Sequence, residues 1–372
     1  MFHLKENNTT VKTEIMAGVT SFMTMAYILA VNPNILAAAG MDHGAVFTAT
    51  AVASFIGTLC MALFANYPFA LAPGMGLNAY FAYTVVLGMG YSWEVALAAV
   101  LTEGIIFIIL SCFNIREAIF NAIPFNLKKA VSVGIGLFIT FLGLQNAKIV
   151  IGGATLVGLF SVDGYNKTLA DGLTASMSDA GITVLLAIFG VLITGILIVK
   201  NVKGNILWGI LITWILGIIC QFAGIYIPNP DLGFYNLLPD FSNGISIPSL
   251  APIMFKFSLK GVPVLEFIVI VFAFLFVDLF DTLGTLIGVS AKADMLDSEG
   301  RLPRIKGALL ADAVGTTCGA CLGTSTVTTF VESASGVTEG GRTGLTSLTT
   351  GILFLLSLFL SPIFLAIPSF AT

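Results

Sequence analysis

Charged residues are scarce in this chain. Asp, Glu, Lys and Arg make up only 10% of its 372 residues, against roughly 25% in a typical soluble domain, whereas 57% of the residues are hydrophobic. A soluble fold cannot cover that much apolar surface, so the composition indicates a polytopic membrane protein. The net charge of -4 is spread over loops and a few intramembrane carboxylates. It provides no basic surface for nucleic acid.

Patterns for metal binding and covalent catalysis are also missing. The chain has two histidines and five cysteines, and no cysteine stands at metal-ligand spacing from a histidine. Neither HExxH nor GxSxG occurs. We therefore expect packing roles for the cysteines, no metal, no cofactor and no catalytic residue.

Long apolar runs dominate what is present. About eleven runs approach the ~20 residues needed to cross the hydrocarbon core of a bilayer. Their approximate limits are 15–33, 45–64, 68–89, 94–113, 130–150, 181–199, 204–226, 263–289, 307–323, 324–340 and 343–366. The polar residues before the first run do not form a basic, cleavable signal peptide, so we expect this run to be retained.

The basic residues predict the orientation of the chain. If the N-terminus is cytoplasmic, twelve of the sixteen Lys and Arg residues fall on the cytoplasmic side, as the positive-inside rule requires. These twelve are Lys5, Lys12, Arg116, Lys128, Lys129, Lys200, Lys203, Lys292, Arg301, Arg304, Lys306 and Arg342. We predict a multi-pass protein of the cell membrane with a cytoplasmic N-terminus.

A weak internal repeat appears at an offset of 258 positions. The offset places Thr58 on Thr316 and the stretch 70–78 on 328–336. Both stretches combine an extended piece with a short helix of small residues, which is the pattern of a broken membrane segment lining a cavity. Since the first copy has seven spans, an odd number, the second enters the membrane in the opposite orientation. Inverted repeats with paired broken helices are typical of secondary transporters.

Two carboxylates lie near the middle of the eighth run. Asp278 and Asp281 share one helical face with Thr282. A carboxylate at this depth costs several kcal/mol unless it is paired, hydrated or protonated. Burial favours the protonated form, which suits a proton-binding role. The alternative is that each Asp only bonds a facing helix end.

The broken segments supply two further candidates. Glu332 lies in the first turn of a short helix, where the helix dipole favours its ionised form and burial disfavours it. Because these two effects oppose each other, the side chain can gain or lose a proton when a ligand binds. Asn78 lies one turn into the other short helix, and its amide can both donate and accept. The alternatives are a helix cap for Glu332 and backbone bonding for Asn78. For Glu103 and Asp312 we favour structural hydrogen bonds.

Three stretches, 72–81, 276–285 and 323–344, resemble the signatures of the AzgA-like adenine/guanine/hypoxanthine permeases, a branch of the nucleobase-cation symporters within the nucleobase/ascorbate transporter superfamily. The resemblance covers essentially the whole chain. It implies an all-α membrane fold of fourteen spans in two inverted seven-span repeats, with spans 3 and 10 discontinuous. By this resemblance Asn78, Asp278 and Glu332 match purine-binding positions, and Asp281 lies beside them. The full set of candidate substrate-binding residues is Asn78, Asp278, Asp281, Phe330, Glu332 and Ser333. Tyr27, Phe274 and Phe330 are candidates for an aromatic wall.

The resemblance also implies two domains. Residues 1–129 (spans 1–4) and 263–372 (spans 8–11) would form a core that carries the substrate, residues 130–230 (spans 5–7) the first part of a gate, and residues 231–262 an extracellular loop. Nothing in the sequence corresponds to gate spans 12–14, so we expect either a truncated chain or natural loss of these spans.

The predicted function is import of purine nucleobases by proton symport, with elevator-like movement of the core against the gate. Asp278, Asp281 and Glu332 are the predicted proton-coupling residues. The predicted partners are the purine nucleobase, protons and the lipid bilayer, with a homodimer as one option. An anion, uracil or xanthine carrier of the same fold is the nearest alternative, and an intramembrane enzyme using the Asp pair is a more distant one. The sequence does not choose among adenine, guanine and hypoxanthine.

Overall fold

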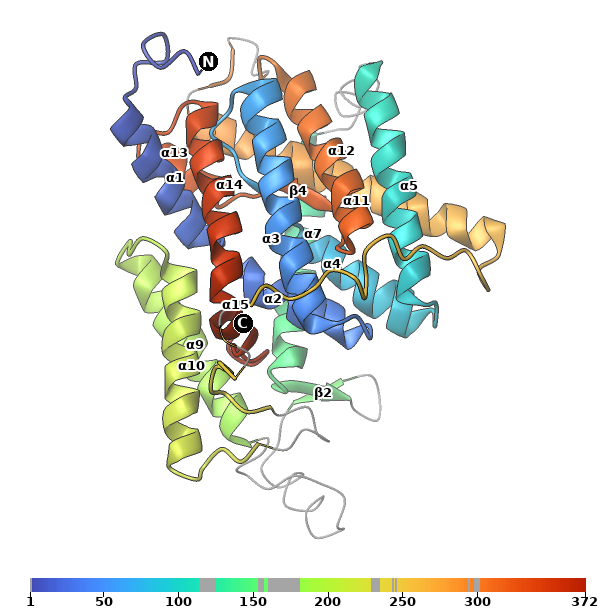
Figure 1. Ribbon diagram of the computed structural model, residues 1–372, viewed down its shortest axis with the longest axis vertical. Helices are drawn as coiled ribbons and strands as arrows, with labels where there is room; N and C mark the ends of the chain where they lie inside the picture. The colour runs from blue at the N-terminus through green and yellow to red at the C-terminus, as the bar shows by residue number, and fades with distance from the viewer. Residues whose placement is uncertain are drawn as a thin grey trace. The chain divides into compact units, whose positions relative to one another are not determined.

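The computed structural model describes residues 2–113, 125–152, 157–159, 181–228, 235–242, 244, 246–293, 295–297 and 302–372. Helices predominate in this part of the chain (Figure 1). The elements are α1 Val11–Met25, α2 Ile28–Ala38, α3 His43–Cys60, η1 Met61–Ala65, β1 Leu71–Pro73, α4 Met75–Ala79, η2 Tyr80–Gly88, α5 Trp93–Cys112, α7 Phe125–Asn146, β2 Val150–Gly152, β3 Val157–Leu159, α9 Ile182–Val199, α10 Asn205–Phe222, α11 Val264–Lys292, α12 Ile305–Leu322, β4 Val327–Thr329, α13 Ser333–Thr338, α14 Gly344–Leu356, η5 Ser357–Leu360 and α15 Ser361–Leu365.

Seven helical stretches among the described residues are long and apolar enough to cross a membrane. They are Val11–Ala38, His43–Ala65, Trp93–Cys112, Ile182–Val199, Asn205–Phe222, Ile305–Leu322 and Gly344–Leu365, and each matches a predicted run. The runs predicted at 130–150 and 263–289 are covered by α7 and α11. In the two remaining runs a short strand precedes a short helix, so the predicted helical membrane fold with two broken segments is confirmed.

The basic residues used to predict the orientation are described only in part. Arg116, Lys167 and Arg301 lie outside the described residues, as do the side chains of Lys128, Lys129 and Lys292.

The two broken segments meet in an antiparallel pair of strands. β1 pairs with β4 in the register Leu71↔Thr329, Ala72↔Thr328 and Pro73↔Val327, and all six residues are buried. This pairing satisfies backbone groups that would otherwise be costly to bury at membrane depth.

Helices α3 and α12 hold the paired strands in a matching way. The Thr58 hydroxyl accepts a hydrogen bond from Leu71 N at 2.9 Å and donates to Leu71 O at 3.1 Å. The Thr316 hydroxyl does the same for Val327, at 3.2 and 2.9 Å. Because Thr58 and Thr316 are the residues matched by the internal repeat, the strand crossing lies on a local two-fold axis.

The strands do not follow the predicted offset of 258. The middle pair of the register is Ala72 with Thr328, so a two-fold axis through this pair superimposes Leu71 on Val327. These two residues are 256 positions apart. The prediction that placed 70–78 on 328–336 is therefore wrong by two positions. The reason is chain length, since Leu71 lies 13 residues after its threonine and Val327 only 11 residues after its own.

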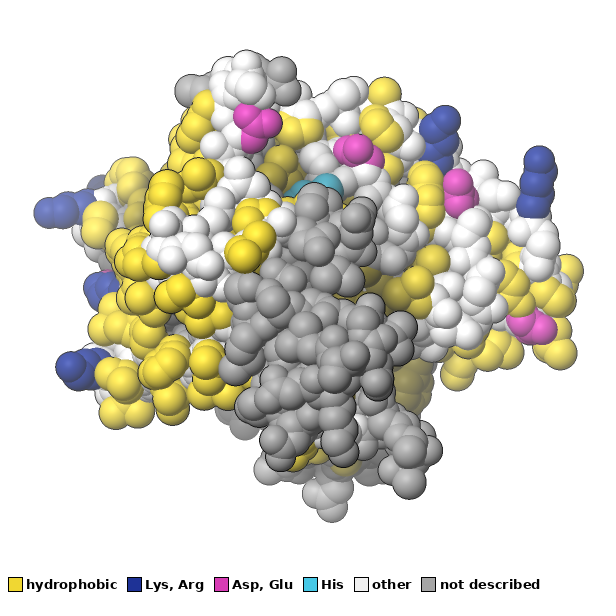
Figure 2. Space-filling model, turned by 90° about the horizontal axis from the view of Figure 1, so that it is seen from below, with side chains coloured by type: hydrophobic (Ala, Val, Ile, Leu, Met, Phe, Trp, Pro, Cys, Tyr) yellow, Lys and Arg dark blue, Asp and Glu magenta, His cyan; other side chains and the backbone are white. Residues whose placement is uncertain are grey.

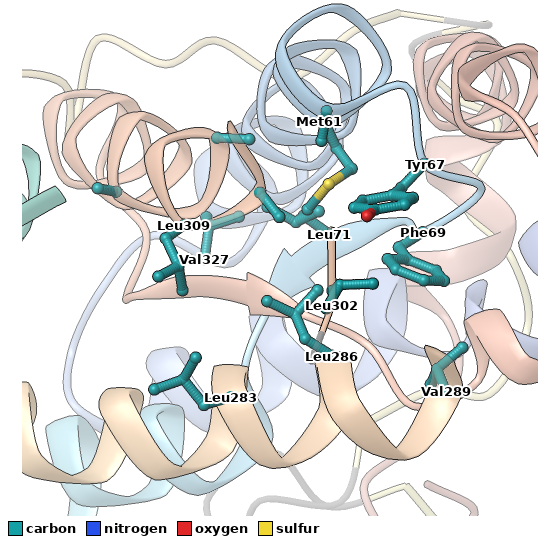
Figure 3. Close-up of a cluster of buried hydrophobic side chains, with 14 of the residues drawn as sticks. Met61, Tyr67, Phe69, Leu71, Leu283, Leu286, Val289, Leu302, Leu309 and Val327 are labelled. Atoms are coloured by element: carbon teal, nitrogen blue, oxygen red, sulfur yellow. The ribbon is translucent and has the colours of Figure 1, made fainter. Parts of the chain in front are cut away.

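The chain divides into two compact units, Met1–Gly136 with Ser246–Ser361 and Leu137–Ile245 with Pro362–Thr372. In the first unit, α5, α12, α3 and α14 lie side by side around the strand crossing (Figure 1). A buried apolar cluster in this unit draws Met61 and Phe69 from the first repeat and Leu286 and Leu309 from the second (Figure 3). Burial of this cluster therefore joins the two repeats.

In the second unit, glycines bring α9 and α10 together. A Cβ atom on Gly190 would overlap Thr213, and one on Gly209 would overlap Thr194. Much of the outer face of α9 is apolar and exposed, with Val191 at 69%. Figure 2 also shows hydrophobic side chains on the described part of the surface seen from below.

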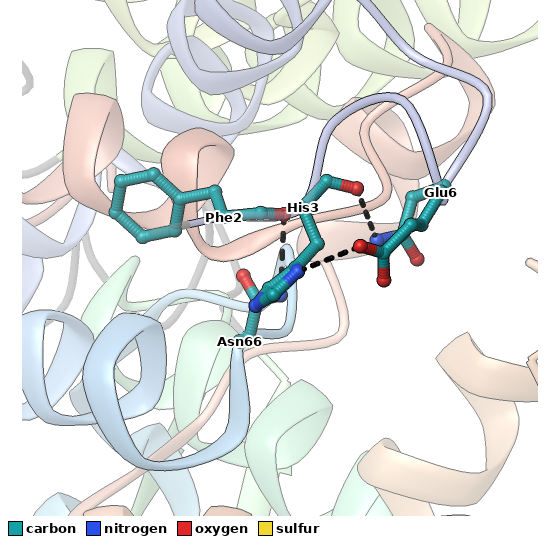
Figure 4. Close-up of polar contacts among 5 residues, drawn as sticks. Phe2, His3, Glu6 and Asn66 are labelled. Carbon is teal, nitrogen blue, oxygen red and sulfur yellow. Dashed lines mark hydrogen bonds and ion pairs between the residues drawn. The ribbon is translucent and has the colours of Figure 1, made fainter.

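Polar side chains tie the N-terminal residues and α1 to the start of α14. Asn66, whose φ of 53° is left-handed, donates to Phe2 O at 3.3 Å (Figure 4). It also accepts from Gly344 N at 2.8 Å. The fully buried carboxylate of Glu14 accepts from Arg342 N at 2.9 Å and from the Thr346 hydroxyl at 2.6 Å. Gly344 N belongs to the first turn of α14, where backbone N–H groups have no partner inside the helix, so Asn66 satisfies one of these groups.

Candidate functional site

A buried hydroxyl joins two carboxyl groups beside the strand crossing. Thr282 Oγ1 lies 2.9 Å from Asp278 Oδ1, 2.8 Å from Asp312 Oδ1 and 2.7 Å from Thr328 Oγ1. All four residues are at most 1% exposed. The structure thus connects α11, α12 and β4 through one hydroxyl group.

The two carboxyl groups share the single proton of this hydroxyl. A threonine hydroxyl has one proton to donate and can otherwise only accept. Thr282 can therefore donate to Asp278 and Asp312 only alternately or through a shared bond. The hydrogen bonding of each of these two acids thus depends on the other.

Asp281 lies on the side of the crossing where β1 ends. A Cβ atom on Gly74 would lie 3.3 Å from Asp281 Oδ2 and 2.6 Å from Thr328 Cγ2, so only glycine fits between them. Asp281 is partly exposed and interacts electrostatically with Asp312 and Glu332. This places two of the predicted acidic residues within electrostatic range of each other.

Glu332 occupies the position just before α13. Its side chain is partly exposed, and its Oε1 accepts a 2.7 Å hydrogen bond from the hydroxyl of Tyr27. Its backbone carbonyl accepts a longer bond, 3.4 Å, from Thr24. The backbone of Glu332 is therefore held from α1, and its carboxylate is held from the junction of α1 and α2. The carboxylate retains lone pairs for a ligand.

The residues just before β4 bond to three buried side chains. The hydroxyls of Thr324, Ser325 and Thr326 bond Asn32, Asn78 and Glu103, respectively. Asn78 is fully buried, and within the described part of the chain its Nδ2 has no hydrogen-bond partner. This amide is a free donor in the broken segment of the first repeat.

Ser333 and Phe330 both form hydrogen bonds with Ala70, the residue just before β1. The Ser333 hydroxyl accepts from Ala70 N at 3.0 Å, and Phe330 N donates to Ala70 O at 3.0 Å. Both side chains are buried. Among the predicted site residues, Asp278 reaches Thr328 through Thr282, and Asp281 interacts electrostatically with Glu332. Asn78 instead meets the chain before β4.

Sequence patterns alone do not predict three contributions. They indicate an aromatic wall for Tyr27 but not its bond to Glu332, and they give no role to Thr282 and Thr328 as links between acids. Asp312 does make a hydrogen bond, but to a hydroxyl that it shares with Asp278. The signal that could have found the cluster is the presence of two acidic residues in neighbouring apolar runs, since buried charges need partners.

The paired strands, the inverted repeat and the carboxylates at the crossing define a membrane transporter of the broken-helix class. Among solved structures, the chain is similar to the transmembrane domain of a cyanobacterial bicarbonate transporter, with a TM-score of 0.69 and 16% identity over 97% of this chain and 86% of that one. It is also similar to the murine solute carrier 26 family member A9 anion transporter, with a TM-score of 0.59 and 8% identity over 97% of this chain and 58% of that one. At these identities the likeness shows the fold.

Sequence comparison gives the family. Residues 12–372 match the model of the Permease family, and the chain belongs to this family. It is 49% identical to a putative permease of Methanocaldococcus jannaschii, 43% to a guanine/hypoxanthine permease of Bacillus subtilis and 40% to an adenine permease of Escherichia coli. Each match covers 100% of this chain and 78%, 80% and 76% of the relative, respectively. Membership of this family indicates a transporter rather than an enzyme.

Proposed function

We propose that this chain carries purine nucleobases across the cell membrane. The observation that carries the proposal is the Glu332 carboxylate, which is held at the strand crossing with lone pairs left for a ligand. A purine offers N–H donors along one edge, and a carboxylate accepts such donors strongly. The names of the Bacillus and Escherichia relatives support this choice of substrate.

We further propose that protons drive the transport. The Asp278 and Asp312 carboxyl groups share the Thr282 hydroxyl, and Asp281 lies within electrostatic range of both Asp312 and Glu332. A proton that leaves this cluster would change the charge beside the ligand. Proton occupancy and ligand binding are then linked, which is what symport requires.

The proposed movement is that of a core against a gate. The first compact unit contains both broken segments and every proposed ligand-binding residue, which supports its assignment as the core. The second unit contains α9 and α10 and would belong to the gate. The distribution of basic residues supports a cytoplasmic N-terminus, and assembly as a homodimer is an option to be measured.

The direct test is uptake of labelled hypoxanthine by cells that lack their own purine carriers. Unlabelled guanine, adenine, hypoxanthine, uracil and bicarbonate are added as competitors. We expect at least one purine to compete at micromolar concentration, and uracil and bicarbonate to be weak. Competition by uracil or bicarbonate, but by no purine, would overturn the proposed substrate class.

A further inference from the structure

Tyr27 lies where the first membrane span is interrupted. Helix α1 ends at Met25 and α2 begins at Ile28, so Tyr27 sits at the junction between them. The side chain is 4% exposed, and its hydroxyl donates to Glu332 Oε1 at 2.7 Å. A residue from the first repeat therefore makes a direct bond to the candidate ligand-binding carboxylate of the second.

The backbones around this bond are locked together. A Cβ atom on Gly336 in α13 would lie 2.7 Å from Ala17 O in α1 and would overlap the hydroxyl of Ser21. Because α1 and α13 already touch at Ala17 and Gly336, the backbone segments that carry Tyr27 and Glu332 are held close to each other.

We propose that Tyr27 is a positioning residue for nucleobase binding. Its hydroxyl fixes the direction of the Glu332 carboxylate, and the remaining lone pairs of that carboxylate then face a ligand N–H group. Ordering this side chain before the ligand arrives removes an entropy cost from binding. The proposal rests on the proposed function, because it assumes that Glu332 accepts from a purine.

The test is a double-mutant cycle measured by purine binding to the purified full chain. Tyr27→Phe removes only the hydroxyl, and Glu332→Asp shortens the carboxylate by one methylene and moves it away from Tyr27. Loss of a hydrogen bond to a charged group should weaken hypoxanthine binding about tenfold in the wild-type background. In the Glu332→Asp background, Tyr27→Phe should change the affinity by less than about twofold, since the bond is already lost.

The matched control is Tyr226→Phe. Tyr226 is 1% exposed, and its hydroxyl donates to Tyr235 O at 2.8 Å, so this variant also removes a buried hydroxyl and its hydrogen bond. We expect wild-type affinity for it. An equal loss of affinity from Tyr27→Phe in both backgrounds would show that Tyr27 acts through general structure and would overturn the proposal.

A second measurement does not depend on the identity of the ligand. The infrared carboxyl band of Glu332 is identified by its loss in Glu332→Gln. We expect this band to shift in Tyr27→Phe and to stay in place in Tyr226→Phe. An unshifted band would overturn the proposal even if purines bind. A shifted band in a protein that binds no purine would instead overturn the proposed function and leave the Tyr27–Glu332 bond established.

Discussion

The change Glu332→Gln tests the candidate site most directly. In the wild-type structure one carboxylate oxygen accepts from Tyr27, and the carboxylate can accept further hydrogen bonds. Glutamine keeps an oxygen that can still accept from Tyr27, but its other polar atom becomes an NH₂ donor. A purine N–H group would then meet a donor instead of a charged acceptor.

The size of the effect follows from these changes. A hydrogen bond to a charged group contributes about 1.5–3 kcal/mol, and an unsatisfied buried donor costs a further ~1–3 kcal/mol. The sum of at least ~2.5 kcal/mol corresponds to a loss of affinity of about 70-fold or more. Because glutamine has nearly the same shape, we expect the protein to insert and fold.

The assay is calorimetric titration of hypoxanthine into purified protein, with thermal melting as the check on folding. Glu266→Gln is the control, because Glu266 lies at the start of α11 beside Tyr91 and away from the strand crossing. We expect this control to bind as the wild type does. Hypoxanthine affinity within threefold of wild type for Glu332→Gln, in a folded protein, would refute the assignment of Glu332 as the acceptor.

Three further outcomes are expected. Accumulation should fall when the pH gradient is collapsed at fixed membrane potential, and unchanged accumulation would exclude protons as the driving ion. Glu14→Gln should cost about 1–3 kcal/mol and lower the melting temperature, because its NH₂ would replace one of the two acceptor oxygens and face the N–H group of either Arg342 or Thr346. A wild-type melting temperature would contradict this. Gly344→Ala should destabilise the protein by about 1–3 kcal/mol, because the new Cβ would lie 2.5 Å from Ala62 O. The control Gly134→Ala should not destabilise it, because no atom lies within 4 Å of the new Cβ. Equal melting temperatures for the two variants would show that the contact at Gly344 can relax.

The sequence by itself determined the spans and the two interruptions. Hydropathy is a local property, and the length of each apolar run sets whether it can cross a bilayer. The stretch 324–340 could be recognised as broken because its Thr, Ser and Gly residues differ from those of the neighbouring runs. The acidic residues Asp278, Asp281 and Glu332 could be selected because charge at membrane depth is costly and needs a partner.

Only the tertiary structure decided which of these residues meet. The two-residue difference between the strands depends on the lengths of the segments that lead from Thr58 and Thr316, and sequence similarity was too weak to reveal it. The bond from Tyr27 to Glu332 joins residues 305 positions apart. The sharing of Thr282 by Asp278 and Asp312 depends on how α11 packs against α12. Such contacts are set by the packing of whole helices, so no local pattern in the chain encodes them.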